Sequence, residues 1–139
     1  MRDLTQNPFY GVIKEYEHWV TLFRYSQVTI GSLIIMSKTN NVRLGQLTPD
    51  EWAGFAEASR DVESWLTTAF GADKFNYLAL MMKDPEVHFH VIPRYSKPIK
   101  FNGNTYIDPD WPLATERVAL VLNDEELDAI KKKIQEIAR

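Results

Sequence analysis

Two histidines stand two residues apart in the apolar stretch EVHFHVIPRY, which covers residues 86–95. An imidazole donates and accepts hydrogen bonds, and its charge changes near neutral pH, so a pair of them can do chemistry that an apolar strand does not need. Side chains alternate between the two faces of a strand. His88 and His90 are therefore predicted to share one face with Glu86, while the apolar residues between them point to the core.

Residue types alone leave three uses of this polar face open. The histidine pair can contribute to a metal site, for which Glu86 and His18 are further candidate ligands. A neutral imidazole can instead attack phosphorus and form a covalent phosphoramidate, while the second histidine orients the first or contacts the phosphate oxygens. The third interpretation is a solvated strand face without a chemical role.

The 139 residues carry a net charge of −3 and contain no cysteine. A chain of this length fits one domain, so residues 1–139 are predicted to form a single domain. The charge argues against a strongly basic nucleic-acid binder, and the lack of thiols excludes disulfides, cysteine nucleophiles and thiolate zinc sites. The opening MRDLTQNPFYGV lacks the apolar core of a signal peptide, and no apolar run approaches the roughly 18 residues of a membrane span. We therefore expect a cytoplasmic protein.

The elements that would position the histidines follow from the rest of the chain. Residues 11–25 are rich in aromatic and β-branched side chains, which favours strands, and residues 30–38 form an apolar run typical of a buried strand. A long amphipathic helix is predicted between a Thr48 cap and a stop at Gly71, with Pro49 in its first turn. Its apolar face is predicted to contain Trp52, Phe55, Ala56, Val62, Trp65 and Leu66.

The second half of the chain adds two hairpins and a terminal helix. Residues 75–82 and 86–95 are expected to pair as antiparallel strands across the short turn KDP, and Asn102-Gly103 marks a further hairpin. A last helix is predicted over residues 123–139, where acids lead and lysines follow. Together these elements predict an α+β domain, in which an antiparallel sheet packs against one long central helix and one C-terminal helix.

In this setting, the stretch VHFHVIPRY resembles the signature of the histidine-triad (HIT) family of nucleotide hydrolases and transferases, in which three histidines alternate with apolar residues. The resemblance extends over most of the chain, because the strand IGSLIIMSK, the helix opening LTPDEW and the strand FNYLALMM precede the motif in the family's order. It implies a HIT-like antiparallel sheet of about five strands with one long central helix and a C-terminal helix.

Carried over by position, His88 matches the family's middle histidine, which is the nucleophile, and His90 matches the third. Glu86 stands in the place of the first histidine, so the chain resembles a two-histidine variant of the triad. A carboxylate beside an imidazole favours its charged form, which would lower the nucleophilicity of His88. Alternatively, Glu86 orients a neighbouring imidazole, and it stays among the substrate-binding candidates. The connection KDP is also shorter than the family's loop, whose polar groups contact the phosphate or the leaving group.

Other substrate-binding candidates are cations and polar residues near the motif. Arg24 stands where many relatives have an asparagine near the nucleotide, and it is either a bidentate clamp on phosphate oxygens or a surface arginine. Lys83 is expected to replace part of the lost loop contacts. Asn76 is a weaker candidate, and Arg94 is a phosphate contact, a dimer contact or a solvated arginine. His18 is expected in a different strand with a structural role.

The resemblance implies an enzyme, a HIT-type nucleotidyl hydrolase or transferase that acts at the α-phosphate of a nucleotidyl conjugate through a covalent nucleotidyl-His88 intermediate. The implied substrates are dinucleoside polyphosphates or nucleoside phosphoramidates. No cofactor is expected, although a divalent cation can accompany the substrate. The expected partners are the nucleotide and a second copy of the chain in a homodimer, with no membrane and no nucleic acid.

Two other functions stay open. A non-catalytic nucleotide-binding module on the same fold would account for the loss of the first histidine and the short connection, but it would not need the nucleophile that His88 represents. A metal-dependent hydrolase would use His88, His90 and Glu86, and it would hold a stoichiometric metal ion.

Overall fold

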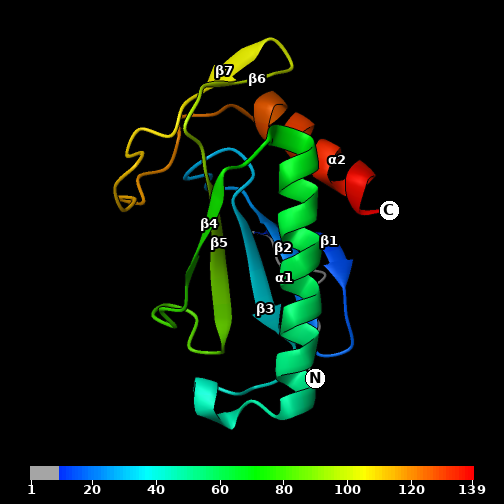
Figure 1. Cartoon of the computed structure of the whole chain (residues 1–139). Helices are drawn as coiled ribbons and strands as arrows, with labels where there is room; N and C mark the ends of the chain where they lie inside the picture. The colour runs from blue at the N-terminus through cyan, green and yellow to red at the C-terminus, as the bar shows by residue number, and fades with distance from the viewer. Residues whose placement is uncertain (1–9) are drawn as a thin grey trace.

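The structure, a computed structural model, describes residues 10–139. Residues 1–9, which carry most of the opening segment considered above for a signal peptide, lie outside this range. The described elements are β1 (Tyr10–Glu15), β2 (Trp19–Arg24), β3 (Leu33–Ser37), the 3₁₀ turn η1 (Leu44–Gln46), α1 (Pro49–Phe70), β4 (Lys74–Leu78), β5 (His88–Arg94), β6 (Ile99–Phe101), β7 (Asn104–Tyr106) and α2 (Asp124–Ala138) (Figure 1). Neither helix in residues 10–139 combines the length and apolar character needed to cross a bilayer.

The main sheet of the described residues has five strands in the order β1-β2-β3-β5-β4, and each neighbouring pair runs antiparallel. This confirms the predicted α+β class and the antiparallel sheet of about five strands. β5, which carries both histidines, is an inner strand with β3 on one side and β4 on the other. The histidines are therefore held by a strand that is paired along both of its edges.

The long helix α1 begins and ends at the residues that the sequence predicts. The Oγ1 of Thr48 accepts a hydrogen bond from the Glu51 N–H at 3.2 Å, and Gly71 adopts a left-handed conformation with φ of 70°. The buried apolar stripe of the helix consists of Ala58, Val62, Trp65, Leu66 and Phe70. Trp52 and Ala56 are exposed, contrary to the prediction, because helical geometry places them to the side of this stripe.

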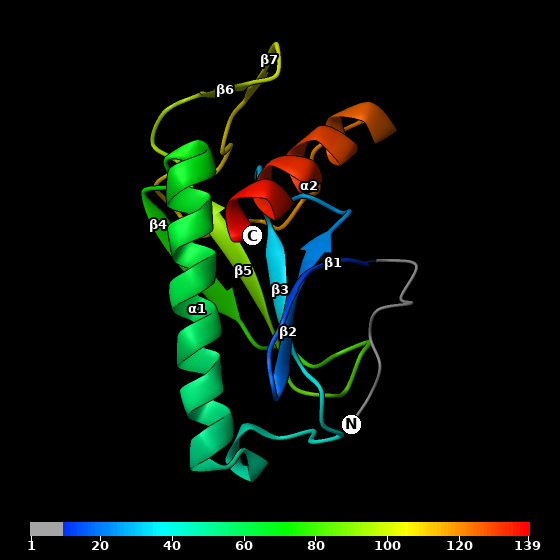
Figure 2. The ribbon, with the colours of Figure 1, turned by 90° about the vertical axis from the view of Figure 1, so that its right-hand side faces the viewer.

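The two faces of the sheet carry different side chains. Figures 1 and 2 show α1 along one face, and α2 packs against α1 and β1. On β5, Phe89 and Val91 belong to the main core between the sheet and the helices, as the alternation predicts. On the opposite face, a second buried cluster lies beside the histidines and consists of Val20, Leu22, Ile34 and Met36.

The connection that leads into β5 differs from the prediction. β4 ends at Leu78, and residues 79–87 form a loop that is much longer than the expected KDP turn. Met81 has a φ of 44°, in the left-handed region that is incompatible with an extended strand, so the pairing stops before it. β5 in turn begins only at His88, which leaves Glu86 in the loop rather than on the strand.

The last two predicted features are confirmed. Asn102 and Gly103 join β6 to β7 with φ values of 51° and 83°, the left-handed conformations that this pair tolerates best. At the start of α2, the Oδ1 of Asn123 accepts from the Glu126 N–H at 2.8 Å, and the Oε2 of Glu126 accepts from the Asn123 N–H at 2.9 Å. This reciprocal pair satisfies backbone donors that the first turn of a helix otherwise leaves open.

Candidate functional site

β5 presents its two histidines on the face of the sheet opposite α1. In the antiparallel register, His88 lies across from Met36 of β3, and His90 lies between Ile34 of β3 and Leu78 of β4. The centroids of the two imidazole rings are 5.1 Å apart, and the ring planes meet at 76°. The two imidazoles therefore form one compact polar group within an otherwise apolar row.

The point at which β5 begins is fixed by backbone hydrogen bonds from two other segments. The N–H of Val87 donates to the carbonyl oxygen of Asn41 at 2.9 Å, and the N–H of Ser37 donates to the carbonyl oxygen of Val87 at 3.0 Å. The Val87 side chain is fully buried in the main core. These contacts determine the direction in which the next residue, His88, leaves the backbone.

The ring of His88 is oriented by a backbone carbonyl. Its Nδ1 lies 2.8 Å from the carbonyl oxygen of Glu86. Because a carbonyl oxygen can only accept, Nδ1 carries the proton, and Nε2 of the neutral ring keeps its free electron pair. Only 4% of His88 is exposed, so the surrounding protein keeps most water away from the ring. An oriented, shielded imidazole with a free Nε2 is the arrangement that a nitrogen nucleophile requires.

His90 is a half-buried imidazole with an unsatisfied nitrogen. Its Nδ1 is buried and has no hydrogen-bond partner among residues 10–139. Burial, then the positive charge of Arg24, the neighbouring His88 and the charge of Arg117 lower the pKa of His90 to about 4, against the smaller opposing effect of Asp84. His90 is therefore neutral at physiological pH, and an unpaired buried nitrogen of this kind marks a position of functional interest.

This neutrality gives a prediction that does not depend on any activity. In an NMR titration of the imidazole ring protons, the His90 signal should change with a midpoint near pH 4 rather than near the ordinary value of about 6.5. The His90→Asn variant assigns the signal by its disappearance. A midpoint at or above the ordinary value would mean that water reaches His90 freely and that its environment is not the one described.

Glu86 contacts His88 through its backbone carbonyl, so this contact does not depend on the glutamate side chain. The prediction that Glu86 extends the polar face of β5 is wrong, because the strand starts two residues later, at His88. The group that orients His88 is the backbone carbonyl of Glu86. Since every residue has this carbonyl, loss of a histidine at position 86 does not remove the contact that orients His88.

Comparisons with known proteins identify the fold of the chain. Searches against protein-family models and curated protein sequences found no match. Among solved structures, a histidine triad protein from Marinobacter aquaeolei VT8 superposes with a TM-score of 0.75 at 20% identity, covering 99% of this chain and 96% of that protein. A histidine triad (HIT) protein from Sinorhizobium meliloti 1021 superposes with a TM-score of 0.73 at 22% identity, covering 98% and 95%. The chain has the histidine-triad fold.

A third solved structure with the histidine-triad fold carries a functional description. The hypothetical histidine triad nucleotide-binding protein from Sulfolobus tokodaii strain7 superposes with a TM-score of 0.69 at 16% identity, covering 93% of this chain and 83% of that protein. The matches span nearly the whole chain at low sequence identity. Both layers of the fold, the five-stranded sheet and its helices, are therefore shared with these proteins.

Within the histidine-triad fold of this chain, the predicted substrate-binding residues take different places. Arg24, at the end of β2, is half-buried, and strand alternation puts it on the same face as Leu22 of the second buried cluster, which is the histidine face. Its charge contributes to the low pKa of His90. Lys83 lies exposed in the loop of residues 79–87. The Oδ1 of Asn76, on β4, accepts a hydrogen bond from the Nη1 of Arg94 at 2.9 Å.

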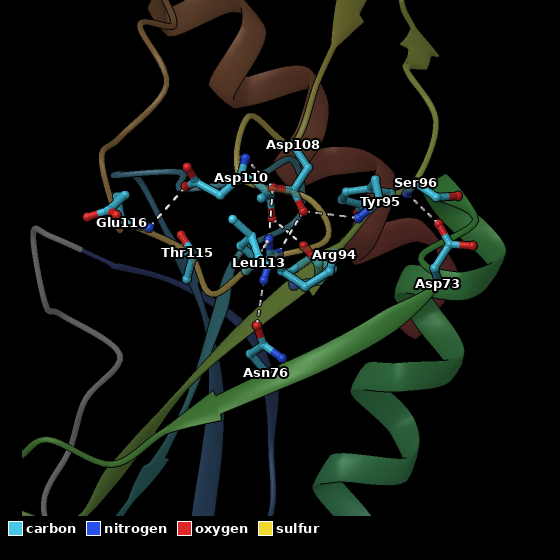
Figure 3. Close-up of polar contacts among 12 residues, drawn as sticks. Asp73, Asn76, Arg94, Tyr95, Ser96, Asp108, Asp110, Leu113, Thr115 and Glu116 are labelled. Carbon is cyan, nitrogen blue, oxygen red and sulfur yellow. Dashed lines mark hydrogen bonds and ion pairs between the residues drawn. The ribbon is translucent and has the colours of Figure 1, made fainter.

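Arg94 is an internal structural residue of this fold. It is only 3% exposed, so the interpretation as a solvated arginine is wrong. Its Nε donates to the Oδ2 of Asp108 at 2.6 Å, and its Nη2 donates to the Oδ1 of Asp108 at 3.2 Å and to the Leu113 carbonyl oxygen at 2.7 Å. Figure 3 shows Arg94 between these groups and Asn76. We call these four residues the Arg94 latch, because they fasten the segment of residues 108–117 to β5 and β4.

Sequence reasoning missed two charged residues near the histidines. Arg117 lowers the pKa of His90, and Asp84 raises it, so both charges act on the site. Arg117 lies in an irregular segment before α2 and has a φ of 58°. Neither residue belongs to a periodic pattern or a motif, so no signal in the sequence marked them.

His18 lies outside the site, and the described residues do not form the metal site considered from the sequence. His18 lies in the turn between β1 and β2, not in a strand as predicted, and its Nε2 is 3.7 Å from the Oε1 of Glu17. Among residues 10–139, no three histidine, aspartate or glutamate side chains are arranged to hold a metal ion. The set of His88, His90 and Glu86 therefore does not form the metal site considered from the sequence.

Proposed function

We propose that the protein is a nucleotidyl hydrolase or transferase that forms a covalent nucleotidyl-His88 intermediate at the α-phosphate of its substrate. The candidate substrates are dinucleoside polyphosphates and nucleoside phosphoramidates. The histidine-triad fold supports the general class of nucleotide-binding or hydrolytic proteins. The observation that carries the catalytic proposal is the hydrogen bond from the Nδ1 of His88 to the Glu86 carbonyl, since it leaves Nε2 as a nucleophile.

The first step is an in-line displacement at phosphorus. The electron pair on Nε2 of His88 forms a bond to the α-phosphorus, while the bond from phosphorus to the leaving group breaks and the leaving group takes its electrons. A polyphosphate leaves as an anion, whereas an amine also takes up a proton from solvent as it leaves. Negative charge on the equatorial oxygens is stabilised by hydrogen bonding to the neutral His90 and by the positive charge of Arg24. Because His88 is shielded from water, these interactions act in a medium where they are strong.

The second step returns the enzyme to its starting state. A water molecule attacks the α-phosphorus, the bond from phosphorus to Nε2 of His88 breaks, and the proton of the water passes to solvent. The product is a nucleoside monophosphate, and transfer to another acceptor would follow the same path with that acceptor in place of water. No group of the protein changes its oxidation state, and no cofactor of the protein is required.

The test of this proposal is intact-mass spectrometry of the protein mixed with adenosine 5′-phosphoramidate or with diadenosine tetraphosphate. The reaction is quenched at alkaline pH, because phosphoramidate bonds to histidine are acid-labile. We expect a transient adduct of one nucleoside monophosphate, absent in His88→Ala and retained in His90→Asn. A wild-type protein that binds the nucleotides in calorimetry without an adduct or release of monophosphate would contradict the proposal and favour a non-catalytic binding module.

Two expectations remain predictions beside this proposal, one from the resemblance and one from the sequence itself. The protein is expected to act as a homodimer and to reside in the cytoplasm. The residues assigned to the reaction, His88, His90 and Arg24, all come from the same sheet of one chain.

A further inference from the structure

The peptide group between Glu86 and Val87 is held at both of its polar atoms. Its carbonyl oxygen belongs to Glu86 and lies 2.8 Å from the Nδ1 of His88. Its N–H belongs to Val87 and donates to the carbonyl oxygen of Asn41 at 2.9 Å. The group is trans and planar, so its N–H and its carbonyl point in opposite directions and can only turn together. The contact at Asn41 therefore fixes the direction of the carbonyl that orients His88.

Asn41 is tied to helix α1 by its side chain. It lies in the irregular segment between β3 and η1, and its Nδ2 donates to the Oε2 of Glu51 at 3.2 Å. Glu51 belongs to the first turn of α1 and is only 9% exposed. A hydrogen bond to a carboxylate that is shielded from water is stronger than one between neutral groups in solvent. The Glu51 side chain therefore anchors the backbone of Asn41 to the helix.

The backbone of Glu51 is itself held on two sides. Its N–H donates to the Oγ1 of Thr48 at 3.2 Å, and its carbonyl oxygen accepts from the Nε1 of Trp19 at 2.7 Å. Trp19 is fully buried at the start of β2. Figure 1 shows the first turn of α1 at the end of the sheet where β5 begins. The Glu51 carboxylate therefore has a fixed position from which it reaches Asn41.

Two hydroxyl groups shape the segment that carries Asn41. The Oγ of Ser37, at the end of β3, lies 2.8 Å from the Oγ1 of Thr39 and accepts from the Thr39 N–H at 3.1 Å. The Oγ1 of Thr39 in turn accepts from the Asn41 N–H at 3.3 Å. These bonds curl the chain back after β3, so the Asn41 carbonyl meets the N–H of Val87.

We infer that Asn41 and Glu51 are positioning residues that set the tautomer of His88. In water a neutral histidine favours the tautomer with its proton on Nε2, and a hydrogen bond at Nδ1 reverses this preference. The bond between Asn41 and Glu51 keeps the Glu86 carbonyl facing Nδ1, which leaves Nε2 free. The effect on rate rests on the proposed function, because only a nucleophile at Nε2 needs the proton on Nδ1. Both residues act through the peptide group and not through the substrate.

Long-range ¹H–¹⁵N NMR spectra of the histidine rings test this inference directly. A ring nitrogen with a proton and one without have widely separated ¹⁵N shifts, so the spectra distinguish the tautomers at about pH 9, above the ordinary imidazole pKa of about 6.5. The wild type should carry the His88 proton on Nδ1, and His88→Asn assigns the signals by their disappearance. Asn41→Asp sets two carboxylates against each other, and Glu51→Ala removes the acceptor. Both variants should shift His88 toward the tautomer with its proton on Nε2.

The Asn41→Asp/Glu51→Gln double variant serves as the rescue. It exchanges the amide and the carboxylate, so one hydrogen bond between them returns with its direction reversed. The wild-type tautomer should return, and kcat for release of nucleoside monophosphate should recover from a loss of about 10- to 100-fold in Asn41→Asp. The matched control is Asp61→Asn, which weakens another contact of α1, with the Tyr16 hydroxyl and the Lys14 ammonium, and should leave the tautomer unchanged.

The outcomes separate this inference from the proposed function. An unchanged tautomer in the folded Asn41→Asp and Glu51→Ala variants would overturn the inference, and so would a change that the double variant does not reverse. The two single variants break the same contact in different ways, so one folded variant is sufficient. The spectra need no substrate. A tautomer that is lost and restored as expected, in proteins that release no monophosphate, would support the positioning role and reject the proposed function.

Discussion

Replacing His88 with asparagine is expected to lower kcat for release of nucleoside monophosphate by about 10⁴-fold or more. Asparagine can keep the hydrogen bond to the Glu86 carbonyl through its amide N–H, and it fits within the space of the imidazole. It has no nucleophilic nitrogen, however, so the covalent route is lost while the local structure is kept. Steady-state assays with a sensitive readout of monophosphate measure the change.

Two other histidine variants serve as the comparison and the control for this result. His90→Asn should lower kcat by about 10- to 100-fold, because it removes a contact to the phosphate oxygens and not the nucleophile. His18→Asn should have no effect on kcat, since His18 lies in the turn between β1 and β2. If His88→Asn keeps activity within about tenfold of the wild type, His88 is not the nucleophile and the proposed mechanism is wrong.

Replacing Asp108 with alanine is expected to reduce the free energy of unfolding by about 3–5 kcal/mol. The substitution leaves the Arg94 guanidinium, which is 3% exposed, without its carboxylate partner. It also removes acceptors for the backbone N–H groups of Tyr95 and Asp110, each 3.2 Å from an Asp108 oxygen. An unpaired buried charge is far more costly than a missing ion pair, so the single substitution should destabilise more than the Arg94→Met/Asp108→Leu double substitution.

Urea unfolding of the purified variants measures this difference. The slope of the unfolding free energy with urea should stay the same, and the midpoint should move, if the native and unfolded states keep their compactness. The matched control is Asp128→Ala, which removes an exposed ion pair with Lys132 on α2 and should leave the midpoint unchanged. A midpoint for Asp108→Ala equal to that of this control would show that the Arg94 latch does not stabilise the fold.

The same carboxylate gives the stability a defined pH dependence. Burial alone would raise the pKa of Asp108, but hydrogen bonds from Arg94 and from the Tyr95 and Asp110 N–H groups hold it below its ordinary value. A carboxyl group with a lowered pKa in the folded state stabilises the fold above the pKa of the unfolded chain, which is about 3.9. This stabilisation is therefore complete near neutral pH and is lost as the pH falls through the folded-state pKa, and it should be missing from the acid unfolding curve of Asp108→Asn.

Local patterns predicted the parts of the fold whose causes are local. Thr48, Gly71 and the Asn102-Gly103 pair were predictable because a cap or a left-handed turn depends on the residue itself and its immediate neighbours. The alternation of polar and apolar residues around His88 is also a local pattern, so it predicted which face of β5 meets the core. The extent of β4 was not predictable in this way, since the apolar residues after Leu78 fit a strand equally well and the backbone at Met81 ends it.

The parts of the site that escaped prediction depend on contacts between distant segments. Arg94 and Asp108 pair across 14 positions, and neither residue type nor spacing distinguishes such a pair from two solvated charges. Arg117 follows the segment that this pair fastens, and its charge acts on His90. The orientation of His88 depends on a backbone carbonyl, which no side-chain pattern can reveal.

The position of β5 inside the sheet has a consequence for the lifetime of the site. Its backbone is hydrogen-bonded to β3 and to β4, so exchange of its full set of amide protons for solvent deuterium requires disruption of the sheet on both sides. Opening of β1 at the far edge, or of the small β6–β7 hairpin, leaves His88 and His90 where they are. The pair of imidazoles therefore keeps its place in a partly opened molecule wherever the centre of the sheet is intact.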